Sequence, residues 1–140
     1  MIAIIRIHGM IKVRFNIDET LSRLRLRRKY CCVVVNDVPE TTGMITKVKD
    51  FVAYGNITEE TLVKLIKERA EKIGDKKAKI ENPEKIAKEL IAGKSFEELG
   101  IKPFFRLHPA RGGINSKKHY PKGVLGNNKE GINKLIERML

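Results

Sequence analysis

The sequence predicts an α+β protein in which strands and helices alternate over the first 56 residues. Two stretches carry the strand prediction. Residues 2–8 place apolar side chains at alternating positions, and residues 30–35 form a continuous run rich in β-branched residues. Apolar residues at helical spacing separate these stretches. With 140 residues, 41% of them hydrophobic, the chain is long enough for one domain with a packed core.

The first 56 residues predict a β-α-β-α-β unit. We expect strands at residues 2–8, 30–35 and 51–54, and helices at residues 17–25 and 42–48. The predicted caps of the two helices are Asn16, with Glu19 completing a capping box, and Thr42. In the first strand we expect Ala3, Ile5 and Ile7 on one face, and Ile2, Ile4, Arg6 and His8 on the other.

The next segment, residues 57–100, is predicted to be helical. Thr58 is the expected N-cap of a first helix that ends at Gly74. Asn82 and Pro83 begin a second helix, because proline is favoured at the first helical position, and Gly93 stops it. This segment is expected to be an insertion after the core.

Residues 101–140 are predicted to complete the fold with a strand, a basic loop and a helix. A capping box at Ser95 and Glu98 precedes this part of the chain. The strand is expected at residues 103–107. Residues 109–128 have little periodicity and many Gly, Pro, Asn and Lys residues, so they predict a loop. The terminal helix carries a stripe formed by Ile132, Leu135, Ile136 and Met139.

The charge of the chain is strongly basic and unevenly distributed. The formal net charge is +12. Residues 1–54 hold ten Lys and Arg against five Asp and Glu, and residues 101–140 hold nine against two. Residues 55–100 hold ten of each and are neutral. Two basic ends around a neutral segment favour a polyanionic partner, most simply a nucleic acid.

Several classes of protein do not fit the sequence. The longest apolar run, residues 31–35, is far shorter than the roughly 20 residues that span a bilayer, and we expect no secretory signal. The only cysteines, Cys31 and Cys32, are adjacent, which favours a reducing cytoplasm over a disulfide framework. Neighbouring strand residues point to opposite faces, so these two predict buried apolar side chains and not a metal site. We expect no catalytic residue, metal or cofactor.

The densest basic cluster follows the first predicted helix. Its five cations are Arg23, Arg25, Arg27, Arg28 and Lys29. Cations at a helix end are favoured by about 0.3–1 kcal/mol each, but five so close together repel one another. Because the planar guanidinium matches phosphate geometry, the cluster predicts contacts to an RNA backbone. The alternative is a solvated helix face.

Two further basic segments are candidates for the same interface. The stretch FRLHPARGGINSKKHYPKG has no apolar face, so we expect it to become ordered only on a nucleic acid; the alternative is a loop with incidental charge. In TTGMITKVKD, a helix beginning near Thr42 and Gly43 could hold a phosphate on its N-terminal amides, with Lys47 and Lys49 beside it. The alternative there is capping alone.

Three of these segments together resemble a known family. The stretches IAIIRIHG, LRLRRKYCCVVV and NDVPETTGMITKVKDFVAYG are similar to the L-thirty family of large-subunit ribosomal proteins. The helical insertion, FFRLHPARGG, the basic loop and the terminal helix resemble its long archaeal and eukaryotic form. The resemblance implies a ferredoxin-like core with a small, three-stranded antiparallel sheet and no catalytic role. It also implies a division into a core domain (1–56), a helical insertion (57–100) and a C-terminal part packing on the core (101–140).

The resemblance also implies a function and a set of contacts. We expect a structural constituent of the large ribosomal subunit that binds ribosomal RNA by shape and stabilises its fold during translation. It would be a ribosome-bound cytoplasmic monomer with neighbouring ribosomal proteins as partners. The alternative is a free-standing general nucleic-acid-binding protein; an enzyme would need a catalytic set that we do not find. The implied RNA-binding residues are Arg6, His8, Arg23, Arg25, Arg27, Arg28, Lys29, Thr42, Gly43, Lys47, Lys49, Arg106, His108, Arg111, Lys117 and Lys118.

Overall fold

The α+β architecture and the β-α-β-α-β core are confirmed by a computed structural model that describes residues 1–74, 80, 82–114 and 116–140. In this order, the core contains β1 (Ile2–Arg6), α1 (Phe15–Arg23), β2 (Cys31–Val35), α2 (Pro39–Val48) and β3 (Val52–Asn56). The rest contains α3 (Glu59–Arg69), α4 (Pro83–Ile91), β4 (Phe105–Arg106), β5 (Gly126–Asn127) and α5 (Gly131–Met139).

The sheet contains the three-stranded antiparallel core that the resemblance implied, and the strand expected at residues 103–107 is confirmed by β4. The sheet has five strands in the order β4-β2-β1-β3-β5. β1 pairs antiparallel with β2 and β3, so that Ile4 lies opposite Val33 on one side and Tyr54 on the other. The two short edge strands extend this core, with β4 antiparallel to β2 and β5 parallel to β3. β5 falls within residues 109–128, where we expected a loop. The sequence does not predict this strand, because the two residues Gly-Asn carry no strand pattern.

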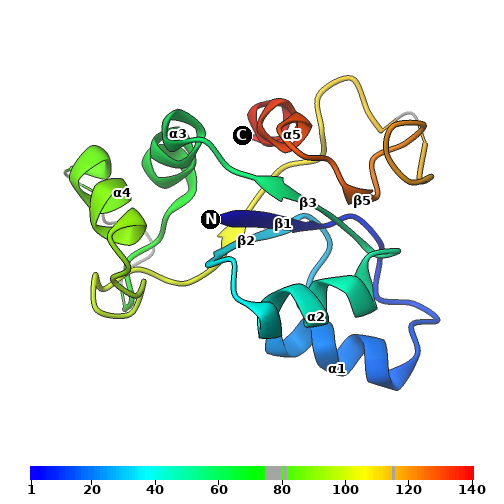
Figure 1. Ribbon diagram of the computed structural model, residues 1–140. Coiled ribbons are helices and arrows are strands. Elements are labelled where there is room, and N and C mark those ends of the chain that lie inside the picture. Colours follow the sequence, from blue (N-terminus) through cyan, green and yellow to red (C-terminus); the bar gives the residue numbers. More distant parts are fainter. Residues whose placement is uncertain (75–79, 81, 115) are drawn as a thin grey trace.

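Helices cover both faces of the sheet (Figure 1). The expected division of the first strand is confirmed. Ala3 and Ile5 belong to one core cluster, together with buried residues of α3, α4 and α5. Ile2 and Ile4 belong to the other cluster, which includes buried residues of α1 and α2. β1 is therefore buried on both sides, and α3 and α4 pack on the same core as the sheet.

The two core helices begin earlier than the sequence predicted. α1 begins at Phe15, its N-cap is Arg14, and no side chain caps it, so the expected Asn16–Glu19 capping box is wrong. α2 begins at Pro39, so the expected cap at Thr42 is wrong as well. α2 begins at Pro39 because the fixed φ of proline and its missing N–H suit the first turn of a helix.

The remaining predicted caps are better matched. The Thr58 hydroxyl accepts a hydrogen bond from the Thr61 amide at 3.4 Å, which confirms Thr58 as the N-cap of α3. Ser95 and Glu98 form the expected reciprocal pair, with both side-chain-to-backbone distances at 3.3 Å. α3 ends at Arg69 and not at Gly74. The chain becomes extended at Ala70, and Lys72 then forms an antiparallel β-bridge with Ile101.

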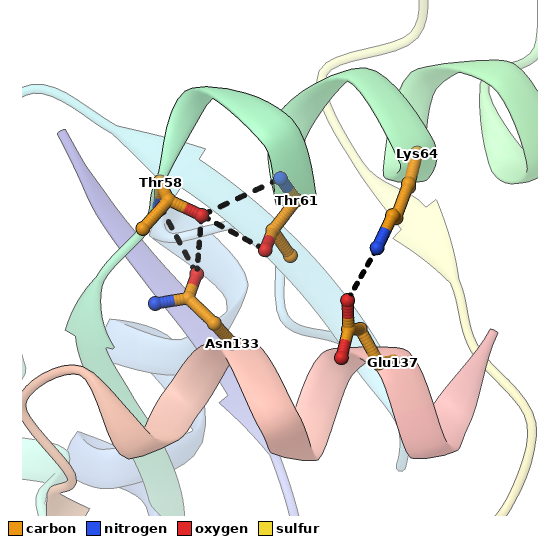
Figure 2. Close-up of polar contacts among 5 residues, drawn as sticks. All are labelled: Thr58, Thr61, Lys64, Asn133 and Glu137. Carbon is orange, nitrogen blue, oxygen red and sulfur yellow. Dashed lines mark hydrogen bonds and ion pairs between the residues drawn. The ribbon is translucent and has the colours of Figure 1, made fainter.

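α3 and α5 lie side by side, as Figure 2 shows. The Asn133 side chain of α5 accepts a hydrogen bond from the backbone N–H of Thr58 at 3.0 Å. Further along both helices, the Lys64 ammonium lies 2.6 Å from the Glu137 carboxylate, which raises the pKa of Lys64. The first contact joins the start of α3 to the start of α5, and the second joins residues further along both helices, so the two helices run in the same direction across the sheet.

Candidate nucleic-acid interface

The topology brings the basic loops to one end of the sheet. β1 ends where β2 and β3 begin, since Ile5 lies opposite Cys32 and Arg6 opposite Val52. At the same end β4 finishes, with Arg106 opposite Cys31, and β5 starts. The segments that enter or leave the sheet here are residues 7–14, 24–30, 49–51 and 107–125. Residues 7–14 and the stretch from 116 to 125 lie on the right of Figure 1.

This end, which we call the basic end, carries most of the unbalanced charge. Its four segments hold eleven Lys and Arg and one acidic residue, Asp50. The segments that enter or leave the sheet at the opposite end, residues 36–38, 57–58, 92–104 and 128–130, hold three Lys and four acidic residues. The sequence showed where positive charge lies along the chain, and the order of the strands gathers it in space. Such a surface attracts a polyanion.

A cleft at the β4 edge joins two predicted clusters that are far apart in the sequence. It has a volume of about 560 Å³ and lies between the segment before β2 and the strand β4. Cys31 pairs with Arg106, which brings Arg106 next to the end of the Arg23–Lys29 cluster. We call it the β2–β4 cleft; its lining is Arg25, Arg27, Arg28, Lys29, Tyr30, Cys31, Pro103, Phe104, Arg106 and Leu107.

The cations of the first cluster differ in their availability. Arg23 pairs with Glu19 at 2.5 Å, and Arg25 pairs with Glu97 at 2.8 Å. Arg27 and Arg28 are exposed, and neither makes an ion pair with a carboxylate of the described residues. Since α1 ends at Arg23, only that residue lies on the helix, and the helix-face alternative does not fit the others. Arg27 and Arg28 are the best placed to bind phosphate.

Arg6 corrects one expectation, because its side chain is fully buried and cannot face a partner. Its guanidinium donates hydrogen bonds to the carbonyls of Leu26 at 2.8 Å and Arg27 at 3.2 Å. It donates two more, at 3.1 Å each, to the carbonyls of His8 and Gly9. Burial lowers the pKa of Arg6, and Asp18 at 3.7 Å opposes that shift. Arg6 therefore anchors two loops of the basic end from inside.

The α2 segment also differs from the expectation of a phosphate site at a helix N-terminus. The Thr42 amide lies inside the helix and donates to the Val38 carbonyl at 3.0 Å, so it is not free to bind an anion. Gly43 is likewise helical and exposed. Lys47 lies in the last turn of α2 and Lys49 directly after it, and both are exposed at the basic end. The two lysines keep a surface position that suits RNA.

The second basic segment is attached to the fold at two places. His108 and Arg111 are exposed, while their amides donate to the carbonyls of Met139 and Arg138 at the end of α5. Further along, Lys117 and Lys118 are exposed, and residue 115 lies outside the described residues. The ring of His119 lies 2.8 Å from the Asp50 carboxylate. These anchors involve no RNA; the expected ordering of the loop by RNA stays a prediction.

Some features of the basic end were missed. Met10, Ile11 and Phe15 are 62%, 81% and 79% exposed, so apolar side chains alternate with the cations of the β1–α1 loop. His8 is half-buried and packs edge-to-face on Phe51, with ring centroids 5.1 Å apart. The alternation MIKVRF was the available signal, but it is too short to indicate which side chains stay exposed.

Two other expectations concern the cysteines, which were predicted to be buried apolar side chains, and membrane-spanning segments, which were not expected. Both thiols are free and buried. Burial raises the pKa of Cys31 to about 11 and that of Cys32 further, so both are protonated at neutral pH. Within the described residues, none of the helices has the length and apolar character that crossing a membrane requires.

Comparisons with known proteins identify the family of this chain. A family model described as ribosomal protein L30p/L7e matches residues 2–52, which span β1 to the start of β3. The large ribosomal subunit protein uL30 of Archaeoglobus fulgidus is 44% identical, with 99% of both chains covered. Those of Methanococcus maripaludis (strain C5) and Nanoarchaeum equitans are 42% and 40% identical over 99% of this chain and 98% and 97% of theirs. The chain therefore belongs to the uL30 family of large ribosomal subunit proteins.

Proposed function

We propose that this protein binds large-subunit ribosomal RNA through its basic end and holds the folded RNA in place. The observation that carries the proposal is the gathering of eleven Lys and Arg with one acidic residue at one end of the sheet, whereas the other end holds three Lys and four acidic residues. The work is electrostatic: arginine forks and lysine ammoniums neutralise phosphates and release counterions. The protein would act as a monomer on cytoplasmic ribosomes beside other ribosomal proteins, during translation.

Recognition is expected to depend on RNA shape. In an A-form duplex the deep groove hides the base edges, so cations on a rigid surface read the spacing of phosphates and 2′-hydroxyls. The sheet and its helices provide that rigid surface, and Arg6 fixes the loop that carries Arg27. About six neutralised phosphates would give a slope of log affinity against log salt of roughly −4 to −5.

The test is RNA binding by an Arg27→Ala/Arg28→Ala double variant. We expect normal folding, weaker binding to an archaeal large-subunit rRNA transcript, and a salt slope shallower by about 1 for each lost phosphate contact. A Lys85→Ala/Lys88→Ala variant is the matched control, because it removes two exposed cations from α4. Equal effects of the two variants would contradict the assignment of the Arg27–Arg28 pair.

Two measurements separate this function from that of a free nucleic-acid binder. In a sedimentation gradient of a cell lysate, the protein should travel with the large subunit even after a high-salt wash. Duplex DNA should compete poorly for the RNA-bound protein, since its groove shape and sugar differ. A protein that stays at the top of the gradient at low salt, and that DNA displaces as well as RNA does, would overturn the ribosomal role.

A further inference from the structure

The β2–β4 cleft combines cations with aromatic surface. Arg27 and Arg28 lie beside the half-buried rings of Tyr30 and Phe104. An RNA duplex presents phosphates and 2′-hydroxyls on its outside and keeps the faces of its bases stacked. Contact with a duplex would thus neutralise the arginines and use neither of the two rings. A base that has left its stack offers the flat face that such rings bind.

Each ring already has a cation over its face. The Lys29 ammonium lies 4.7 Å from the centroid of Tyr30, and the guanidinium carbon of Arg106 lies 5.8 Å from that of Phe104. Lys29 and Arg106 are exposed, and contacts of this kind are weak at exposed sites. Because both side chains have flexible stems, they can move to an arriving phosphate and uncover the rings for a base.

The backbone of the cleft is held in place before any ligand arrives. Tyr30 has a φ of +62°, which a non-glycine residue keeps only where its surroundings impose it. Its amide donates to the Arg6 carbonyl at 2.7 Å, and its carbonyl accepts from the Leu107 amide at 3.0 Å. On the preceding residues, the Arg6 side chain fixes the carbonyls of Leu26 and Arg27. The wall that carries Tyr30 is therefore tied to β1 and to the residue after β4.

We propose that the β2–β4 cleft binds one unstacked nucleotide of the ribosomal RNA. The base lies against Phe104 and Tyr30, and the adjoining phosphates lie on Arg27 and Arg28. The cleft volume of about 560 Å³ is within the roughly 300–1,000 Å³ of sites that hold small organic ligands. This inference rests on the proposed function, since the RNA delivers the nucleotide.

The test compares two identical substitutions of phenylalanine. Phe104→Leu removes a ring from the cleft and keeps an apolar side chain, whereas Phe15→Leu makes the same change at a ring outside the cleft that is 79% exposed. Affinity for an archaeal large-subunit rRNA transcript is measured over a range of salt concentrations. We expect Phe104→Leu to bind roughly fivefold to a hundredfold more weakly, because it loses base stacking, with an unchanged salt slope. Phe15→Leu, which removes an exposed ring of the basic end outside the cleft, should weaken binding much less than Phe104→Leu.

Ultraviolet cross-linking of the same complex, followed by mass spectrometry of the peptides, is a second readout. A single nucleotide attached to Tyr30 or Phe104 is expected. Thermal melting of each variant checks that the fold is intact. If the wild type binds with a steep salt slope, but Phe104→Leu changes nothing or only as much as Phe15→Leu, and no cross-link forms in the cleft, the nucleotide site is refuted while RNA binding stands. If the wild type does not bind the transcript, the proposed function itself fails.

Discussion

Replacing Arg6 by methionine separates an internal anchor from an RNA contact. The guanidinium of this fully buried side chain donates four hydrogen bonds to backbone carbonyls at 2.8–3.2 Å. Methionine fills a similar space but donates nothing, so carbonyls of two loops lose their partners. The ion pair with Asp18 adds little to the stability of the fold, because the Asp18 side chain is 54% exposed and its carboxylate lies 3.7 Å from the Arg6 guanidinium.

The size of the effect follows from those contacts. Each hydrogen bond from a charged donor is worth about 1.5–3 kcal/mol, but the four are not additive and burial of the cation already offsets part of them. We expect Arg6→Met to lower the free energy of unfolding by about 3–5 kcal/mol, measured by urea denaturation. The free energy of unfolding of Arg6→Lys should lie between those of the wild type and Arg6→Met, since an ammonium keeps the charge but not the planar fork.

RNA binding gives the decisive comparison. Without its anchor the segment 24–30 would have to be ordered on binding, and fixing the backbone of even one residue costs about 1–2 kcal/mol. Affinity for the rRNA transcript should thus fall about tenfold with no change in salt slope, because no phosphate contact is removed. Near-normal stability together with a slope shallower by about 1 would show that Arg6 itself contacts phosphate, and would refute this reasoning.

Three further predictions concern other parts of the fold. Gly55→Ala should cost about 1–3 kcal/mol of stability, seen as a lower melting temperature, because its Cβ would lie 2.2 Å from the Lys129 carbonyl oxygen; an unchanged melting temperature would contradict this packing. The folded-state pKa of Cys31, about 11 against an ordinary 9.0, means that its stabilisation is present below pH 9 and is lost as the pH rises to 11. Wild-type stability should fall over that range by about 2 kcal/mol more than that of Cys31→Ala, and parallel curves would refute the shift. Amides of residues 116–123 should exchange with solvent quickly in the free protein and slowly on rRNA, whereas slow exchange without RNA would show that the His119–Asp50 contact and the loop's own backbone hydrogen bonds already order it.

Much of the local structure could be predicted because it depends on neighbours in the chain. The alternation in residues 2–8 placed Ala3 and Ile5 on one face of β1 and Ile4 on the other, as the two core clusters confirm. The stripe of the terminal helix is also buried as predicted. Errors fell at helix starts, where α2 begins at Pro39 and not near Thr42, and at β5, whose two residues form a strand only because β3 runs beside them.

In the candidate site, too, the features that depend on neighbouring residues were predicted and those that depend on tertiary packing were not. Exposed cations such as Arg27, Arg28 and Lys47 occupy the surface positions that their clusters indicated. Arg6 was misassigned because alternation tells on which face of a strand a side chain lies, but not what covers that face. Its carbonyl partners, Leu26 and Arg27, are 20 and 21 residues away in the sequence.

Residue patterns along the chain are enough to predict the order of the core elements, the two faces of β1, and the presence of two basic segments around a neutral one. These follow from periodicity and charge, which are properties of short stretches of chain. The tertiary structure alone decided that the basic segments meet at one end of the sheet, that Arg106 lies beside the Arg27 cluster, and that Arg6 is internal. Each of these depends on strand pairing or burial between residues distant in sequence, which no local pattern contains.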